Sequence, residues 1–101
     1  MNDRLLSFLG LCKRAGYLIS GADTVIKSMR EHKALLALTA NDFSDNSLKN
    51  VRKAAEENKV PLKTLEYTKD KLSFALGKHC GVISVTDKGF ADKILVMLSE
   101  E

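Results

Sequence analysis

Apolar residues recur along the chain at two different spacings, and the two spacings alternate. Over residues 3–14, Leu5, Phe8, Leu9 and Cys12 lie three and four positions apart, as residues on one face of a helix do. The same kind of spacing predicts further helices at about 21–31, 45–58, 68–77 and from 87 onward. Short apolar runs predict strands at 17–19, 35–38, 60–65 and 82–85.

This alternation indicates one α/β domain over residues 1–101. Strands that alternate with helices favour a sandwich with helices on both faces of a small sheet. A chain of 101 residues has the usual length of one domain. It is long enough to bury a core without a disulfide or a structural metal. No internal repeat, linker or low-complexity segment divides it.

Charge and cysteine content indicate which kinds of partner and which cellular compartment to expect. Sixteen Lys and Arg against thirteen Asp and Glu give a net charge of +3, which fits either simple solubility or a mildly basic nucleic-acid binder. Cys12 and Cys80 form no Cys-x-x-Cys pair, which favours a reducing compartment. Because the sequence shows neither a signal peptide nor a long apolar run, a cytoplasmic protein without a membrane partner is expected.

Residues that commonly carry catalysis are few and poorly arranged. His32 and His79 form no metal-ligand pattern, and no glycine-rich phosphate-binding motif follows a strand. His79 and Cys80 are neighbours in the sequence, which rarely places a base and a nucleophile face to face. We therefore expect no enzyme, no cofactor and no metal, although a thiol enzyme that uses Cys80 remains an alternative.

Residues 14–28 combine a basic helix end, a strand and a helix led by glycine. The N–H groups and the dipole at a helix start attract phosphate, and Gly21 allows another backbone to approach closely. The candidate phosphate-binding side chains in and beside this segment are Lys13, Arg14, Lys27 and Arg30. The alternative interpretation is an ordinary capped helix in which Asp23 pairs with Lys27 four residues later.

A second candidate segment, residues 77–82, joins a helix to the predicted fourth strand. Lys78 and His79 offer hydrogen-bond donors, and Cys80 and Val82 offer apolar surface next to the flexible Gly81. An unstacked base fits such a mixture, because RNA-binding proteins prefer splayed nucleotides to duplex edges. The alternative is a tight connection between helix and strand that binds nothing.

At these two segments the chain resembles the superfamily of kink-turn RNA-binding ribosomal proteins, the L-seven-Ae and L-thirty-e type. The resemblance rests on Leu9–Gly16 with Ser20–Asp23, on Gly21–Ser28 with Lys33–Leu38, and on Leu72–Val85. It covers nearly the whole chain and is greatest for the bacterial YlxQ-like branch. It implies a three-layer α-β-α sandwich around a mixed four-stranded sheet. It also implies an RNA-binding face made by the start of the second helix and the loop before the last strand.

The resemblance assigns roles to individual positions. In the superfamily a glycine admits the RNA backbone and a lysine one turn later contacts the RNA, and Gly21 and Lys27 match these positions. The loop that covers an extruded nucleotide corresponds to His79, Cys80, Gly81 and Val82. The helix start also includes Ala22, Asp23 and Thr24. Members often carry Asn or Lys where this chain has Asp23, and a carboxylate cannot donate to guanine O6.

The expected function is therefore that of a non-enzymatic protein that binds a structured, kink-turn-like RNA. Its partner would be ribosomal RNA or a structured mRNA element, with the ribosome as a further candidate, and the protein is expected to be a monomer. The main alternative is a module of the same fold that docks to the translation or transcription machinery without touching RNA. Steep weakening of RNA binding by salt would separate the two hypotheses.

Overall fold

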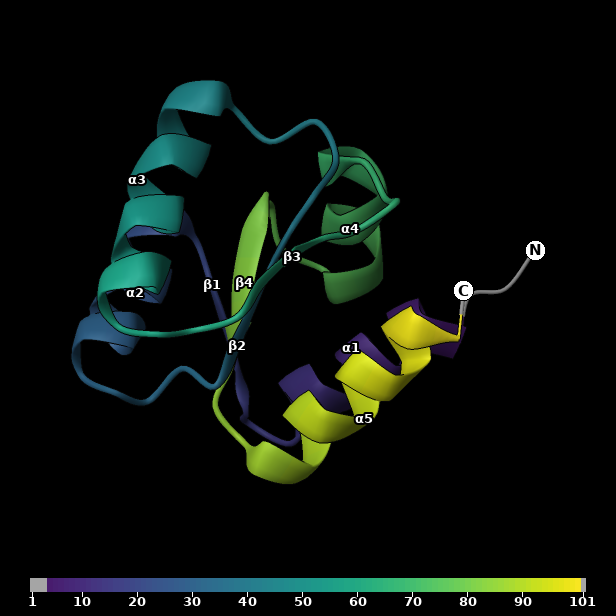
Figure 1. Ribbon diagram of the computed structural model, residues 1–101. Coiled ribbons are helices and arrows are strands. Elements are labelled where there is room, and N and C mark those ends of the chain that lie inside the picture. Colours follow the sequence, from purple (N-terminus) through teal and green to yellow (C-terminus); the bar gives the residue numbers. More distant parts are fainter. Residues whose placement is uncertain (1–3, 101) are drawn as a thin grey trace.

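The computed structural model describes residues 4–100 and contains the predicted alternation of helices and strands (Figure 1). The fold is α/β, as predicted. The elements in chain order are α1 (Arg4–Arg14), β1 (Leu18–Ser20), α2 (Ala22–Arg30), β2 (Leu36–Thr39), α3 (Asp45–Glu57), β3 (Leu62–Thr64), α4 (Lys69–Leu76), β4 (Val82–Val85) and α5 (Lys88–Ser99). No helix in this range is long and apolar enough to cross a membrane.

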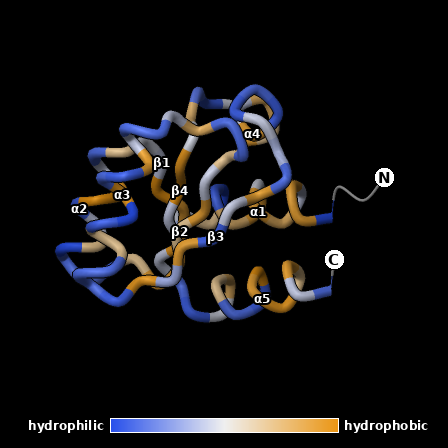
Figure 2. The backbone as a smooth tube through the Cα atoms, turned by 45° about the horizontal axis from the view of Figure 1, so that its top comes forward, coloured by the Kyte–Doolittle hydropathy of each residue, from blue (hydrophilic) through white to orange (hydrophobic). Residues whose placement is uncertain are grey.

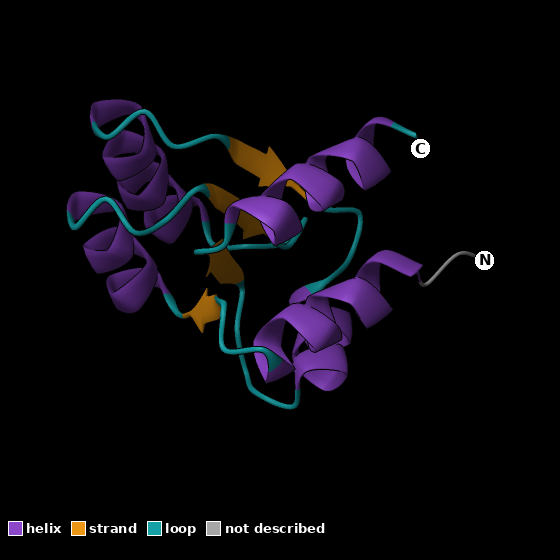
Figure 3. Ribbon diagram, turned by 90° about the horizontal axis from the view of Figure 1, so that it is seen from below, coloured by secondary structure: helices purple, strands orange, loops and turns teal. Residues whose placement is uncertain are grey.

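The four strands form one mixed sheet in the order β1-β4-β2-β3. Strand β4 runs antiparallel to both β1 and β2, whereas β2 and β3 are parallel. Helices α2 and α3 cover one face, and α1, α4 and α5 lie on the other (Figure 3). The three-layer sandwich that the resemblance implied is therefore confirmed.

The two inner strands are apolar because both of their faces are covered. Every residue of β2 and β4 is buried, as expected for strands between two helical layers. Leu38 and Ile83 join the core beneath α1, α4 and α5, and Ala37 and Val82 join the core beneath α2 and α3. In Figure 2 the apolar colour accordingly gathers along the inner strands, whereas several connecting loops are hydrophilic.

Some predicted boundaries are wrong by one or two residues. Ser20 pairs with Ile83 as the last residue of β1, although the sequence suggested that it begins the next helix. Leu35 was expected in the second strand, but it precedes β2 and its side chain is 41% exposed. These errors fall at the ends of short elements, where tertiary pairing rather than local pattern sets the limits.

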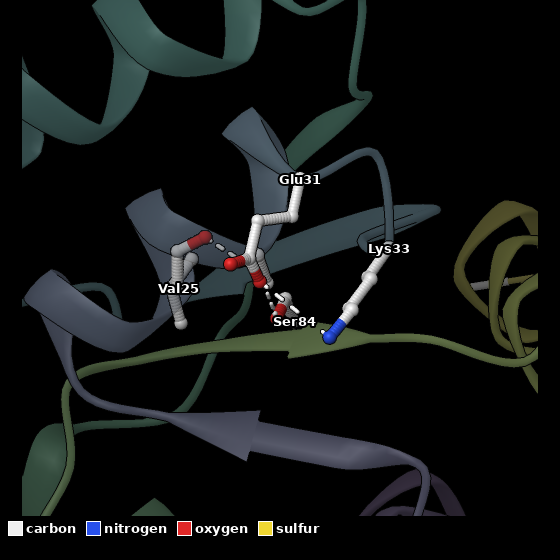
Figure 4. A network of polar contacts seen from close by, with 5 residues as sticks. Val25, Glu31, Lys33 and Ser84 are labelled. Atoms are coloured by element: carbon white, nitrogen blue, oxygen red, sulfur yellow. Dashed lines mark hydrogen bonds and ion pairs between the residues drawn. The ribbon is translucent and has the colours of Figure 1, made fainter.

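A polar contact crosses the core between α2 and β4 (Figure 4). The Ser28 hydroxyl donates to the Val25 carbonyl at 2.6 Å, and its oxygen lies 3.0 Å from the Ser84 hydroxyl. Both serines are buried. Since the Ser28 proton is committed to Val25, the Ser84 hydroxyl is the donor of the second bond.

The loop before β4 is fixed by hydrogen bonds from both neighbouring strands. The Gly21 amide donates to the Val82 carbonyl at 3.1 Å, and the Ala40 amide donates to the Gly81 carbonyl at 2.9 Å. These bonds continue the β1–β4 and β2–β4 ladders beyond the last paired residues. The start of α2, the loop after β2 and the loop before β4 are consequently held at one end of the sheet.

Helix α4 fixes the same loop from a third side. The Ser73 hydroxyl accepts from the Cys80 amide at 3.0 Å and donates to the Cys80 carbonyl at 3.2 Å. Gly77 ends α4 in the left-handed conformation, which turns the chain toward this contact.

The Phe43 ring packs directly against Gly81. A Cβ atom built on Gly81 would lie 2.5 Å from Phe43 Cδ1, which is closer than van der Waals contact allows. Glycine is therefore required at position 81 by close packing, since its backbone conformation is an ordinary one.

Removing the Ser28 hydroxyl is expected to cost more than removing its partner. In Ser28→Ala the buried Ser84 hydroxyl loses its acceptor, which costs about 1–3 kcal/mol of unfolding free energy. In Ser84→Ala the Ser28 hydroxyl keeps its bond to Val25, so we expect a loss of about 1 kcal/mol. Urea denaturation of both variants measures the difference, and equal losses would contradict the assigned donor direction.

Gly81→Ala is expected to lower the unfolding free energy by about 1–3 kcal/mol, because the added methyl group displaces the Phe43 ring. The matched control is Gly10→Ala within α1, where an added Cβ would lie 3.8 Å from Arg14 Nη1 in ordinary contact. There alanine is expected to stabilise the helix by up to about 1 kcal/mol. Thermal or urea unfolding should thus give shifts of opposite sign, and a neutral Gly81→Ala would refute the close packing.

Candidate nucleic-acid interface

The start of α2 and residues 77–82 lie side by side at one end of the sheet. The hydrogen bond from Gly21 N to Val82 O joins the two segments directly. They are more than fifty residues apart in the sequence, and the antiparallel pairing of β1 with β4 brings them together. The juxtaposition that the resemblance implied is therefore confirmed as geometry.

Gly21 gives α2 an open beginning. Its φ of 97° and ψ of 141° lie where only glycine is readily accommodated. No side chain caps the first turn, so the N–H groups at this end are available to an external acceptor. The Thr24 hydroxyl is turned back onto the carbonyl oxygens of Ser20 and Gly21, which steadies the turn.

Asp23 in the first turn of α2 and Lys27 in its last turn are both exposed. The ordinary-helix interpretation expected them to pair, but among residues 4–100 no ion pair joins them. Lys27 therefore keeps its charge unneutralised one to two turns from Gly21.

Arg30 lies at the opposite end of α2, roughly 13 Å from Gly21 at the usual helical rise. It lines a groove of about 550 Å³ between α2 and α3, and Asp23 lines the same groove. Arg30 is therefore not gathered with the residues at the helix start, although it shares their helix.

Within residues 77–82 the side chains divide by exposure. Lys78 and His79 are exposed, whereas Cys80 and Val82 are buried in the core. The expectation that Cys80 and Val82 offer apolar surface is wrong. Val82 belongs to strand β4, whose residues are all buried, and Cys80 lies in the core beneath α1, α4 and α5. Their backbone groups are also engaged, because Ser73 pairs with the Cys80 amide and carbonyl and Gly21 donates to the Val82 carbonyl.

Burial also lowers the reactivity expected of the Cys80 thiol. It raises the pKa of Cys80, although the Ser73 hydroxyl and the ammonium groups of Lys78 and Lys13 act in the opposite direction. A buried, protonated thiol is a poor nucleophile. Burial, with a smaller effect of Asp87, raises the pKa of Cys12 to about 11. In the described part of the chain, no three His, Cys, Asp or Glu side chains group as a metal site.

Lys13 and Arg14 point to different places. Lys13 donates to the Leu76 carbonyl at the C-terminus of α4, next to Gly77, so its charge lies beside the 77–82 loop. Arg14 instead lines a groove between α1 and α5. Successive helical residues point about 100° apart, so the adjacent cations do not extend one basic edge as expected.

Sequence patterns did not identify two aromatic residues near this end of the sheet as parts of the site. Phe43 covers Gly81, as described above, and Phe74 is 91% exposed on α4, one turn before Gly77. The helical spacing of Leu72 and Leu76 already indicates that Phe74 is exposed, because Phe74 does not lie on the side of the helix that these two residues share.

Comparison with known proteins adds independent evidence. The model of the "Ribosomal protein L7Ae/L30e/S12e/Gadd45 family" matches residues 3–95. A protein named RNA-binding protein YlxQ from Bacillus subtilis (strain 168) is 41% identical over 91 residues, which cover 89% of this chain and 90% of the relative. A protein of the same name from Enterococcus faecium is 33% identical over 91 residues, covering 90% and 87%.

Solved structures show the same fold. A protein with unknown function from Bacillus halodurans superposes with a TM-score of 0.89 and 28% identity, covering 97% of this chain and 99% of the other. The Giardia lamblia 15.5kD RNA binding protein gives a TM-score of 0.75 over 99% of this chain and 89% of the other, at 19% identity. The latter likeness concerns the fold alone.

The family model extends over nearly all of the sequence, and the Bacillus subtilis relative is similar along almost its full length. This chain accordingly belongs to the ribosomal protein L7Ae/L30e/S12e/Gadd45 family.

Proposed function

We propose that this protein binds structured, kink-turn-like RNA through a surface made by the first turn of α2 and the 77–82 loop. It acts by binding alone, as a cytoplasmic monomer, on ribosomal RNA or a structured mRNA element, and the ribosome is its expected setting. The observation that carries this proposal is the Gly21–Val82 hydrogen bond, which sets an uncapped helix start against a basic loop.

The proposed surface is suited to a folded RNA backbone. Uncapped N–H groups and the helix dipole of α2 favour a phosphate at Gly21. Lys27 and Lys78 add exposed positive charge on the two sides, and Lys13 adds a third cation beside the loop. The names of the Bacillus subtilis and Enterococcus faecium relatives, both called RNA-binding proteins, support the same assignment.

The contacts available to an unstacked nucleotide differ from those first expected. Because Cys80 and Val82 are buried, the loop would cover a base with the half-buried Gly81 and the exposed His79. His79 also provides a donor and a flat ring, both of which RNA-binding proteins use on splayed bases.

Lys27→Ala is expected to weaken binding to a kink-turn duplex and to lower the slope of log affinity against log salt by about one. The matched control is Lys63→Ala on the edge strand β3, which two strands separate from β1; it removes an exposed charge that forms no ion pair with another described residue. Affinities measured across a salt series, for both variants and the parent, test the assignment.

The same titration with a duplex whose G·A pairs are replaced by Watson–Crick pairs tests the kink-turn specificity. The parent protein is expected to prefer the kink-turn duplex. Equal affinity for both duplexes would leave only charge attraction. If RNA retention does not depend on salt and is unchanged in Lys27→Ala, the result would instead favour docking to a protein without RNA contact.

Asp23→Asn is expected to raise kink-turn affinity about fivefold. The change removes a negative charge that faces phosphates and adds an amide donor for guanine O6, which together are worth about 1 kcal/mol. Glu100→Gln just after α5, on the other face of the sheet, serves as the charge-matched control, since its carboxylate is exposed and forms no ion pair with another described residue. Unchanged binding by Asp23→Asn would show that this carboxylate does not face the RNA, and weaker binding would show that it accepts a hydrogen bond from the RNA.

A further inference from the structure

We propose that the groove between α1 and α5 docks an acidic, amphipathic helical segment of a partner protein. The groove has a volume of about 440 Å³ and is lined by Arg4, Ser7, Phe8, Leu11, Arg14, Lys93 and Met97. It lies on the α1, α4 and α5 side of the sheet, whereas the surface at Gly21 belongs to the α2 side (Figure 3). The proposal is therefore independent of the RNA-binding proposal.

The floor of the groove is apolar and continues beyond it. Leu11 is 46% exposed and lies beside the half-buried Phe8 ring. Phe8 packs on Phe90 with ring centroids 5.1 Å apart, and Phe90 packs on the exposed Tyr17 at 5.9 Å. An exposed apolar strip of this kind on a helix pair is typical of a surface that receives side chains from a partner.

The rim of the groove carries charge of a single sign. Arg4, Arg14 and Lys93 are cations, and none of the described residues that line the groove is acidic. Within residues 4–100, no ion pair neutralises Arg14 or Lys93. Potentials across an interface are usually complementary, so the partner is expected to place carboxylates on both sides of its apolar anchor residues.

Other occupants fit this surface less well. In a symmetric pair of two copies the same cations would face one another across the interface. RNA would match the cations, but the one ring in the floor, Phe8, is half-buried and packed on Phe90, and the most exposed apolar side chain is the aliphatic Leu11. An amphipathic helix with Leu-like residues three and four positions apart, flanked by Glu or Asp, satisfies both the floor and the rim.

Selection from a display library of random peptides tests the proposal on the intact protein, with a Lys93→Glu variant used for counter-selection. We expect the enriched peptides to share large aliphatic residues at helical spacing between acidic residues. Backbone amide NMR signals of α1 and α5 should shift when a synthetic copy of such a peptide is added. Lys93→Glu and Leu11→Ala should each weaken its binding about tenfold.

Lys49→Glu provides the matched control, because it reverses an exposed charge on α3, across the sheet from the groove. Its peptide affinity should equal that of the parent, and unchanged melting temperatures should show that all three variants are folded. Enrichment of neutral or basic peptides, no enrichment at all, or NMR shifts centred outside α1 and α5 would overturn the proposal. So would a dimer that Leu11→Ala dissociates, or displacement of the peptide by kink-turn RNA.

Discussion

The register between β1 and β4 is the constraint on which the candidate site depends. Ser20 lies opposite Ile83, so the next position along the ladder sets Gly21 opposite Val82, where the amide–carbonyl bond forms. A slip of one residue would turn every buried side chain of β4 to the opposite face, which the two cores exclude. The burial pattern of β4 thereby places the start of α2 next to the 77–82 loop. This end of the sheet needs no ligand to organise it.

Most of the fold follows from the sequence because its patterns are strong and local. The apolar spacing of residues 3–14 predicts a helix, and the short apolar runs at 35–38 and 82–85, the second interrupted by Ser84, have the length of strands. The order of the strands does not follow from such patterns, because pairing between β4 and its two neighbours joins distant segments. Here the resemblance to a known superfamily provided what local reasoning lacks, namely the mixed sheet.

The candidate site was predictable in part, and the errors share a cause. Gly21 at the opening of a helix and Lys27 on its exposed face follow from local spacing. The directions of Arg14, Cys80 and Val82 do not, since each depends on which neighbouring element covers that side of the chain. The exposure of Phe74, in contrast, could have been predicted from local spacing. It lies two positions from Leu72 and therefore off the buried side of α4.

Helix α1 links the two surfaces of the molecule through adjacent residues. Lys13 places its ammonium group on the C-terminal carbonyl of α4, where a cation is favoured by the helix dipole, and so adds charge beside the 77–82 loop. Arg14, one residue later, belongs to the groove with α5. The two adjacent cations of α1 thus contribute to two different surfaces. Since the two surfaces use different side chains of α1, an RNA on one and a peptide on the other would not compete for the same side chains.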